Sequence, residues 1–369
     1  MDPKPIDVKP NPAFGSPERN PSPVEGEAYR TVEDSMDFVA EIVGDENRQG
    51  QRVQAGPILK LMYDAAVAVA FRHCARRSVL VRLDRIDLTR RLRHMDLLRM
   101  EGRLIEAGSS SMVVEVRCFS QKPTERLFAP SHVGFYTMVA IDPEGQPSRN
   151  IPKLSYETAR GVEAKALAAH RRAELAERQQ ALAWIDQAER FTVEDVVEPD
   201  SVPRQDRVHP EQTLIQVKSQ LTPLGGAPDG RIRGGDLLVW LDRVATYTAR
   251  NFTRNDHAIT ISLNDVQLKR PLHSTDRIEL QSRVVYVRTH TLEVSIDITV
   301  HTLNGPPWSL GSVDFLILNY DSSGEKQRIT TGLVLEESDQ EGLRRYLKAR
   351  TRYSFWKSNP ESHLIQLMG

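Results

Sequence analysis

The sequence predicts an α+β protein with two tandem domains, each an antiparallel sheet wrapped around a central helix, joined by a helical linker. The main observation is an internal repeat. Three blocks recur at one offset of about 180 residues: Ala55–Cys74 matches Gly234–Thr253, Leu83–Asp96 matches Leu263–Asp276, and Ser109–Ser120 matches Thr289–Val300. Because three separate blocks share this offset, we interpret the chain as a duplication of one domain.

Each copy begins with a glycine-containing loop that leads into a helix. Ala55 and Gly56 open the first helix, and Gly234 and Gly235 open the second. Apolar residues occupy most sides of both helices, which is typical of a helix buried in a core. We therefore expect each helix to lie at the centre of its domain.

Alternating, β-branched segments follow each helix and predict strands. In the first copy they are Val79–Leu83, Leu97–Ile105, Met112–Phe119 and Val133–Ile141, and in the second Ala258–Leu263, Arg277–Val287, Leu292–Val300 and Gly311–Leu318. A buried helix followed by such strands indicates the hotdog architecture. A single copy would leave a sheet edge uncovered, so we expect the two copies to pair.

The remaining segments set the predicted domain boundaries. Residues 1–34 are rich in proline and poor in large apolar residues, which predicts a disordered tail. The hotdog domains are predicted at residues 35–155 and 210–335. Residues 156–209 between them combine a polar, strongly helix-forming stretch with an extended connector. Residues 336–369 are predicted as a short helix at Gln340–Lys348 followed by a tail.

Composition limits the classes of function. The net charge is −1, so the chain lacks the basic footprint of a nucleic-acid-binding protein. The longest apolar stretch, Ala65–Phe71, is far shorter than the roughly 20 residues that span a membrane. Cys74 and Cys118 form no metal-binding or disulfide pattern, and we expect no metal or other cofactor. The N-terminus resembles neither a signal peptide nor a transit peptide, so we expect a cytoplasmic protein.

Familiar catalytic motifs are absent from the sequence. It contains no G-x-S-x-G nucleophile elbow, no Walker A loop and no H-E-x-x-H zinc motif. Instead, the segments GPILKLMYDAAVAVAFRHC, RGGDLLVWLDRVATYTARNF and VYVRTHTLEVSI resemble the signature blocks of the double-hotdog acyl-CoA thioesterases. The resemblance covers about Ser35–Ile329. It implies hydrolysis of acyl-CoA thioesters to the free acid and CoA.

The resemblance also implies a catalytic carboxylate. In this family a carboxylate on the central helix of one hotdog works with an amide side chain from the loop before the helix of the other. Asp242 matches the carboxylate position and would activate water or act as a nucleophile. It lies in an apolar run, where an unpartnered carboxylate is costly to bury. The structural alternative is an ion pair with Arg243 or Arg250.

The start of the second helix matches the loop that supplies the oxyanion hole in the family. Gly234, Gly235 and Asp236 occupy this loop, and their backbone N–H groups would hold the thioester oxygen at the positive end of the helix. The alternative for the two glycines is a tight turn with close backbone packing.

Two positions depart from the family pattern. Tyr63 stands where the first copy would carry its carboxylate, and a phenol is a poor base near neutral pH. We therefore expect one working site per chain, with Tyr63 as a substrate contact and the neighbouring Asp64 paired or at the surface. The family's amide falls on Arg52, and a shift by one residue would make Gln51 the amide.

CoA requires positive charge for its phosphates. Basic residues gather in both copies: Arg82, Arg85, Arg90, Arg91 and Arg93 in the first, and Lys269, Arg270 and Arg288 in the second. Most of them, taken singly, are typical of solvated strand faces. We assign Arg288 to substrate binding, together with Arg52, Gly56 and Gly234.

Two further functions remain open beside hydrolysis. A non-catalytic acyl-CoA-binding or scaffolding protein on a degenerate double hotdog is the main alternative. Arg52, Tyr63 and Arg231 favour it, whereas Asp242 with the double glycine before its helix favours the enzyme. A hotdog dehydratase would require an Asp and His pair near the central helix, and His73 lies far down its helix. The resemblance further implies a homo-oligomer, such as a trimer of two-domain chains.

Overall fold

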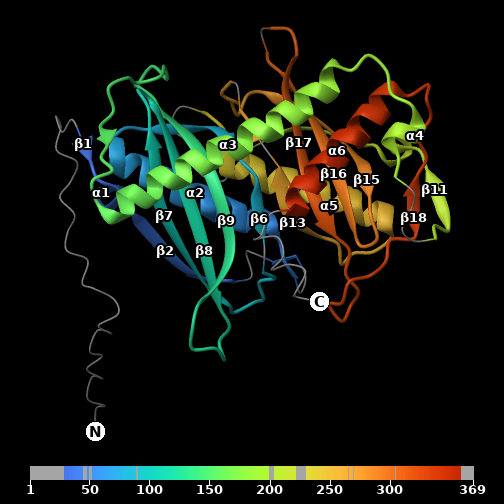
Figure 1. The fold of residues 1–369 in the computed structure, drawn as a ribbon, viewed down its shortest axis with the longest axis horizontal. Helices are drawn as coiled ribbons and strands as arrows, with labels where there is room; N and C mark the ends of the chain where they lie inside the picture. The colour runs from blue at the N-terminus through green and yellow to red at the C-terminus, as the bar shows by residue number, and fades with distance from the viewer. Residues whose placement is uncertain are drawn as a thin grey trace.

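The computed structural model describes residues 29–44, 48–49, 52–88, 90–198, 203–221, 230–264, 266–268, 270–303 and 305–358. Most of the tail predicted at residues 1–34 lies outside these ranges. The described residues form two similar halves with a long helix between them in the sequence, and Figure 1 shows both halves side by side.

The N-terminal half wraps an antiparallel sheet around helix α2 (Ala55–Cys74). Apolar side chains such as Leu59, Met62 and Ala66 are fully buried on this helix, as its all-round apolar sequence predicts. The strands of this half are β2 (Asp37–Ile42), β5 (Ser78–Leu83), β6 (Ile86–Leu88), β7 (Leu97–Ala107), β8 (Ser111–Gln121) and β9 (Ala129–Ala140).

The C-terminal half repeats this arrangement around helix α5 (Gly234–Thr253). Its strands are β12 (Ile215–Gln220), β13 (Ile259–Asn264), β14 (Val266–Gln267), β15 (Arg277–Val287), β16 (Thr291–His301) and β17 (Trp308–Leu318). The predicted fold class, an α+β double hotdog, is confirmed. The sequence did not predict the edge strands β2 and β12, because most of their side chains are exposed and show no apolar alternation.

The two half-sheets join edge to edge into one 12-stranded sheet, with β2 and β12 at its ends. At the seam Leu263 pairs with Ile86, and Val266 pairs with Leu83. Leu83 and Leu263 are equivalent in the repeat, so the seam is related to itself by a pseudo-twofold axis, as in a symmetric homodimer. The expected pairing of the two copies therefore takes place within one chain.

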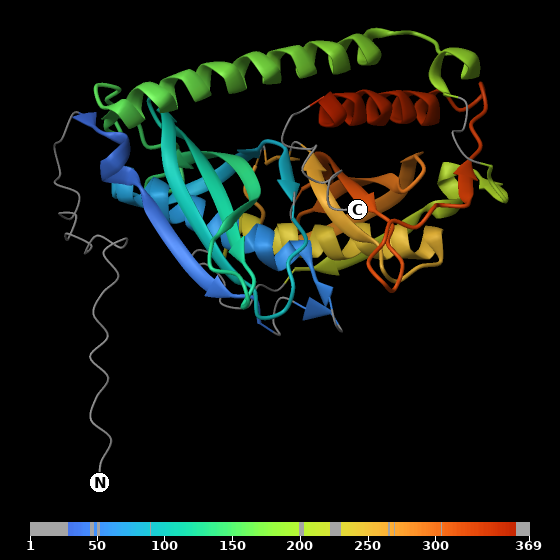
Figure 2. The same ribbon diagram turned by 60° about the horizontal axis from the view of Figure 1, so that its bottom comes forward.

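Helices cover both faces of this sheet. Figure 2 shows α2 and α5 on one side, and α3 (Ala159–Gln187) and α6 (Gln340–Ser358) on the other. Helix α6 extends ten residues beyond the short helix predicted at Gln340–Lys348, since it ends at Ser358. Its last turns lack a clear apolar period, but they are anchored to the sheet by the buried Trp356 and by Arg352, which pairs with Glu293 and Asp314.

Short elements complete the described chain. They are β1 (Tyr29–Arg30), α1 (Val32–Ser35), β3 (Arg48–Gln49), β4 (Arg52–Val53), β10 (Lys153–Leu154), α4 (Val193–Val196), β11 (Asp206–Val208), η2 (Pro210–Thr213) and β18 (Thr331–Leu333). Within the described ranges, no helix is both long and apolar enough to cross a lipid bilayer. The domain boundaries drawn from the sequence stay predictions.

Candidate active site

Asp242 lies where the two halves meet. It projects from the middle of α5, and its side chain is fully buried. One carboxylate oxygen, Oδ2, accepts a hydrogen bond of 2.8 Å from the backbone N–H of Gly56 on α2. The other, Oδ1, accepts one of 2.6 Å from the hydroxyl of Thr260 on β13. The site therefore combines one element of the N-terminal half with two of the C-terminal half.

The environment of Asp242 raises the pKa of its carboxyl group. Burial is the largest cause, and the hydrogen bonds from Thr260 and Gly56 and the charges of Arg250 and Arg243 offset part of it. The carboxylate is thus partnered mainly by two neutral donors, and the ion pair considered from the sequence is not its principal partner. A raised pKa makes the ionised carboxylate a stronger base than an exposed aspartate.

The start of α2 comes very close to α5 at this point. A Cβ atom on Gly56 would lie 3.0 Å from the Cα atom of Val239 and 3.2 Å from Oδ2 of Asp242. Glycine is therefore required for the backbone N–H of α2 to reach the carboxylate. Gly56 is the second residue of a 20-residue helix, so the positive end of the helix dipole faces Asp242.

A cavity of about 620 Å³ opens beside this carboxylate. Thr260 lines it, as do Gln54 and Ala55 at the start of α2. Basic side chains form much of the remaining wall, and they come mainly from the N-terminal half: Arg90, Arg91, Arg93, His94 and Lys122. The cavity thus offers positive charge for an anionic ligand and reaches Thr260, whose hydroxyl contacts the buried Asp242 carboxylate.

Interactions with the protein hold two of these arginines in place. Arg90 pairs with Glu125 at 2.9 Å, and the guanidinium of Arg91 lies 5.5 Å from the centre of the Tyr320 ring. His132 also lines the cavity, where burial lowers its pKa to about 4. It is therefore uncharged near neutral pH, and the cationic character of the wall comes from the arginines and Lys122.

The pseudo-twofold axis relates this contact, between the start of one helix and the middle of the other, to a second contact of the same kind around Tyr63. We call the two contacts the Asp242 crossing and the Tyr63 crossing. Here the start of α5 approaches α2, and a Cβ atom on Gly235 would lie 2.8 Å from the Tyr63 ring. Burial raises the pKa of the Tyr63 phenol, while Arg233 and a hydrogen bond from the Gly234 backbone lower it. Leu80 occupies the place that Thr260 holds at the other crossing, just before the same β-bulge.

Ion pairs surround the crossing at Tyr63. Asp64 pairs with Arg233 at 2.8 Å and with Lys60 at 3.2 Å, and Lys60 also lies 3.3 Å from Asp236. The expectation that Asp64 is a paired residue thus agrees with its position. These pairs tie the start of α5 to α2 at the crossing that has no carboxylate in its centre.

The structure separates residues that the sequence grouped in one site. Gly234, Gly235 and Asp236, expected as oxyanion donors for Asp242, lie at the Tyr63 crossing instead. The reason is the antiparallel contact of α2 and α5, which places the start of each helix against the middle of the other. Gly56, assigned to substrate binding, is the residue whose N–H faces Asp242.

The remaining expected residues lie in three places. Gln51 is outside the described residues, and Arg52 lies in β4, shortly before α2. Arg288 lines a different cavity on the C-terminal half. Two residues of the candidate site, Thr260 and Gln54, were not singled out from the sequence. A polar residue at an inward position of the apolar strand AITISLN was the available signal for Thr260.

Comparison with known proteins identifies the family. The model of the thioesterase superfamily matches the chain twice, at residues 53–126 and 229–302. The acyl-CoA thioester hydrolase YkhA of Bacillus subtilis strain 168 is 30% identical over 132 residues, which are 36% of this chain and 75% of that protein. The chain belongs to the thioesterase superfamily. The expected double-hotdog thioesterase is confirmed. The two matches of the superfamily model fall one on each of the repeated halves.

Two solved structures are among the matches. An acyl-CoA hydrolase from Bacillus cereus is 23% identical and covers 45% of this chain and 100% of its own, with a TM-score of 0.39. An acyl-CoA hydrolase from Agrobacterium tumefaciens is 18% identical and covers 80% of this chain and 98% of its own, with a TM-score of 0.31.

Proposed function

We propose that this thioesterase hydrolyses acyl-CoA thioesters to the free acid and CoA, with Asp242 as the general base. The observation that carries the proposal is the position of the Asp242 carboxylate. It is buried between the N–H at the start of α2 and the Thr260 hydroxyl, next to a cavity lined with arginines. The family membership and the names of the relatives support the same reaction class.

The first chemical step uses both sides of the helix crossing. The thioester oxygen takes over the hydrogen bond from Gly56 N–H, which frees Oδ2 of Asp242 to accept a proton. A water molecule then attacks the carbonyl carbon while Asp242 removes its proton. The developing oxyanion is stabilised by the Gly56 N–H and by the positive end of α2.

The second step releases the thiol. The tetrahedral intermediate collapses, the carbon–sulfur bond breaks, and the CoA sulfur takes the proton that Asp242 had accepted. Because a thiolate is a good leaving group, a carboxylate, an ordered water and an oxyanion donor suffice for this reaction. Thr260 keeps the carboxylate in position by donating to Oδ1 throughout.

A side-chain amide near the start of α2 completes the proposed site. Gln54 caps this helix by position and lines the cavity together with Ala55. It is a candidate for orienting the attacking water, beside Gln51, which the sequence favoured. The variants Gln54→Ala and Gln51→Ala distinguish the two candidates. Substitution of the residue that orients the water should lower kcat more than substitution of the other.

Release of free thiol from a panel of acyl-CoAs, from acetyl to palmitoyl, tests the proposal. The wild type should release thiol, and Asp242→Asn should lower kcat by a factor of about a hundred or more. If the wild type binds CoA and releases no thiol from any member, the hydrolase proposal fails. The non-catalytic acyl-CoA-binding protein then takes its place.

The assembly and location of the protein stay predictions. We expect a homo-oligomer, with a trimer of two-domain chains as the specific form, in the cytoplasm. Light scattering coupled to size-exclusion chromatography gives the number of chains directly, and a mass of one chain would contradict the expected oligomer.

A further inference from the structure

His132 is a buried histidine in the wall of the cavity beside Asp242. Among the described polar residues that line this cavity, only Thr260 and His132 are buried. The Thr260 hydroxyl donates to the Asp242 carboxylate, whereas His132 has no part in the reaction proposed above. A buried polar side chain in a substrate cavity therefore needs an explanation of its own.

One nitrogen of the His132 ring has a partner and the other does not. Nδ1 is hydrogen-bonded to the backbone carbonyl of Ser131, and since a carbonyl oxygen can only accept, Nδ1 carries the proton. Burial lowers the pKa of His132 to about 4, so the ring is neutral near pH 7 and Nε2 has a lone pair. Within the described part of the chain, no donor bonds to Nε2. The cavity wall thus contains a neutral hydrogen-bond acceptor.

The fold does not require a histidine at this position. His132 on β9 pairs with Cys118 at the bulge between β8 and β9. Ile298, the equivalent of Cys118 in the repeat, pairs with Gly311 at the same bulge between β16 and β17. Gly311 is therefore the counterpart of His132, so the other half forms without a side chain here. An acceptor that costs free energy to bury and that the fold does not need indicates a role in binding.

The burial of the wall indicates which end of a CoA thioester reaches His132. The exposed lining residues are all polar, and most are charged: Arg91, Arg93, His94, Ser323 and Glu325. Apart from Thr260 and His132, the buried ones are all apolar: Ile58, Leu92 and Ile261. A CoA thioester has its charged groups at one end and its acyl group at the other. The acyl group therefore suits the buried side of the wall, where His132 lies.

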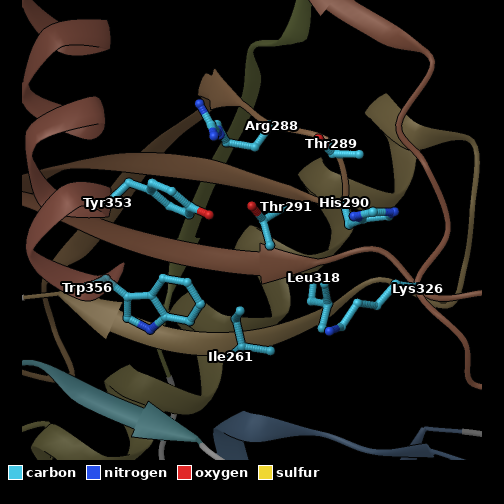
Figure 3. Close-up of a pocket in the computed structure, with 9 residues that line it drawn as sticks. All are labelled: Ile261, Arg288, Thr289, His290, Thr291, Leu318, Lys326, Tyr353 and Trp356. Atoms are coloured by element: carbon cyan, nitrogen blue, oxygen red, sulfur yellow. The ribbon is translucent and has the colours of Figure 1, made fainter. Parts of the chain in front are cut away.

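Close packing holds this buried side in place. Ile261 belongs to a core cluster with Leu318 and Trp356, and Figure 3 shows the three side chains together below α6. Ile58 lies in the first turns of α2 and is part of the main core. Because such a wall cannot rearrange to supply Nε2 with a donor, the donor has to come from the ligand.

We infer that His132 selects acyl groups that carry a hydroxyl, by accepting a hydrogen bond from that hydroxyl at Nε2. The inference rests on the proposed function and names its substrate class, the hydroxyacyl-CoA thioesters. A plain alkyl chain leaves Nε2 without a donor. A carboxylate on the acyl group is excluded more strongly, since it has no proton to donate and would meet a lone pair. His132 lies outside both segments that the superfamily model matches.

Thiol release from six-carbon thioesters tests the inference. The panel is hexanoyl-CoA, its 2-, 3- and 6-hydroxy derivatives, and adipyl-CoA, which ends in a carboxylate. For at least one hydroxy derivative, the wild type should have a kcat/KM at least about fivefold above that for hexanoyl-CoA, the effect of one hydrogen bond. Adipyl-CoA should be a poorer substrate than hexanoyl-CoA.

Variants of His132 test whether its ring causes the preference. His132→Phe keeps a ring of similar size and removes the acceptor, so the ratio of kcat/KM for the preferred hydroxy derivative to that for hexanoyl-CoA should fall at least about fivefold. His132→Gln brings an amide oxygen near the place of Nε2 and should retain part of the ratio. His170→Phe, the same exchange at an exposed histidine of α3, is the control and should leave the ratio as in the wild type.

Binding gives a readout that does not depend on turnover. S-hexyl-CoA and its 2-, 3- and 6-hydroxy derivatives are thioethers and cannot be hydrolysed. In calorimetry, the full-length wild type should bind at least one hydroxylated thioether at least about fivefold more tightly than S-hexyl-CoA. His132→Phe should bind the two alike. Thermal melting shows whether each variant is folded, and His132→Leu takes the place of His132→Phe if the latter unfolds.

Two results would overturn the inference. In the first, the wild type prefers none of the hydroxylated compounds. In the second, the variant without the acceptor keeps the ratio of the wild type, which includes the case that it weakens every thioester equally. The proposed function fails in a different way, through absence of thiol release from every thioester by the wild type. The thioethers still report on His132 in that case.

Discussion

The two crossings of α2 and α5 share one backbone arrangement but differ in the side chain at their centre. At one crossing, Gly56 N–H faces the Asp242 carboxylate, which Thr260 also holds. At the other, the glycines at the start of α5 face the Tyr63 ring. Leu80 stands there in the place of the threonine.

The comparison separates what the fold needs from what the reaction needs. Close approach of a glycine-bearing helix start occurs at both crossings, so it belongs to the packing of the duplicated domain. A buried carboxylate with a hydroxyl partner occurs at one crossing, where its desolvation costs free energy that the hydrogen bonds from Thr260 and Gly56 offset only in part. The other crossing has the Tyr63 ring at its centre in place of a carboxylate, and the ion pairs of Asp64 lie beside it.

The largest expected effect comes from replacing the side chain at the centre of the Asp242 crossing, compared with the same kind of replacement at the Tyr63 crossing. Asp242→Asn should lower kcat for acyl-CoA hydrolysis about a hundredfold or more, since the amide cannot accept the proton of water. Tyr63→Phe should leave kcat within about twofold, because its hydroxyl touches no reacting atom in the proposed site. Steady-state thiol release measures both, and a large loss in Tyr63→Phe would make the two crossings jointly catalytic.

The next effect concerns the hydroxyl that only one crossing has. Thr260→Val removes the hydrogen bond to Oδ1 of Asp242 while it preserves shape, and it should lower kcat about tenfold, as expected for a lost bond to a charged group. Thr260→Ser keeps the hydroxyl and should retain most of the activity. If valine and serine reduce kcat equally, Thr260 acts through packing and not through its hydroxyl.

A smaller effect distinguishes the two helix starts. In Gly56→Ala the new Cβ meets the Val239 backbone at 3.0 Å, so the helices must separate at the active crossing. We expect a loss of about 1–3 kcal/mol in the free energy of unfolding and a several-fold loss of kcat. In Gly234→Ala the nearest atoms are side-chain atoms of Tyr63 and Leu80, at 3.0 and 3.1 Å, which can shift.

Urea unfolding and thiol release on both glycine variants provide the measurement. Gly234→Ala should keep kcat near the wild-type value, with a smaller loss of stability, because the crossing at Tyr63 carries no reacting group. An equal loss of kcat in both variants would show that activity depends on the helix spacing in general and not on the Gly56 contact.

Much of the fold could be predicted from the sequence, because the internal repeat and the pattern of apolar residues indicate its main elements. The two core helices are apolar on most sides and the long strands alternate, and all of them are present. Strands β2 and β12 escaped prediction because edge strands with exposed side chains lack that pattern. The length of α6 also escaped, since ion pairs with Glu293 and Asp314 hold its last turns and these partners are distant in sequence.

Part of the candidate site could be predicted as well. Asp242 stood out as a carboxylate in an apolar run, and its burial agrees with that interpretation. Its partners depend on how two helices 180 or so residues apart cross, which no local pattern encodes. The sequence therefore placed the oxyanion donors at Gly234 and Gly235, on the same helix as Asp242, whereas the structure brings Gly56 to the carboxylate.

The smallest expected effect is on stability and depends on pH. Burial raises the pKa of Asp242 above its ordinary value of 3.8, so the folded state holds a proton that the unfolded chain has already released. The free energy of unfolding of the wild type should therefore fall as the pH rises from about 4 through the raised pKa. Asp242→Asn does not titrate, and its amide can still accept from Gly56 and donate to Thr260.

The variant should consequently be more stable than the wild type at neutral pH, by on the order of 1 kcal/mol, with the difference shrinking toward pH 4. Urea unfolding of both proteins between pH 4 and 8 measures this difference, and Tyr63→Phe serves as a control whose stability difference from wild type should not change over that range. A stability difference for Asp242→Asn that is constant with pH, or that favours the wild type at neutral pH, would mean that the carboxylate is well solvated or ion-paired. In that case, a destabilising buried carboxylate could not explain why we expect catalysis at the Asp242 crossing and not at the Tyr63 crossing.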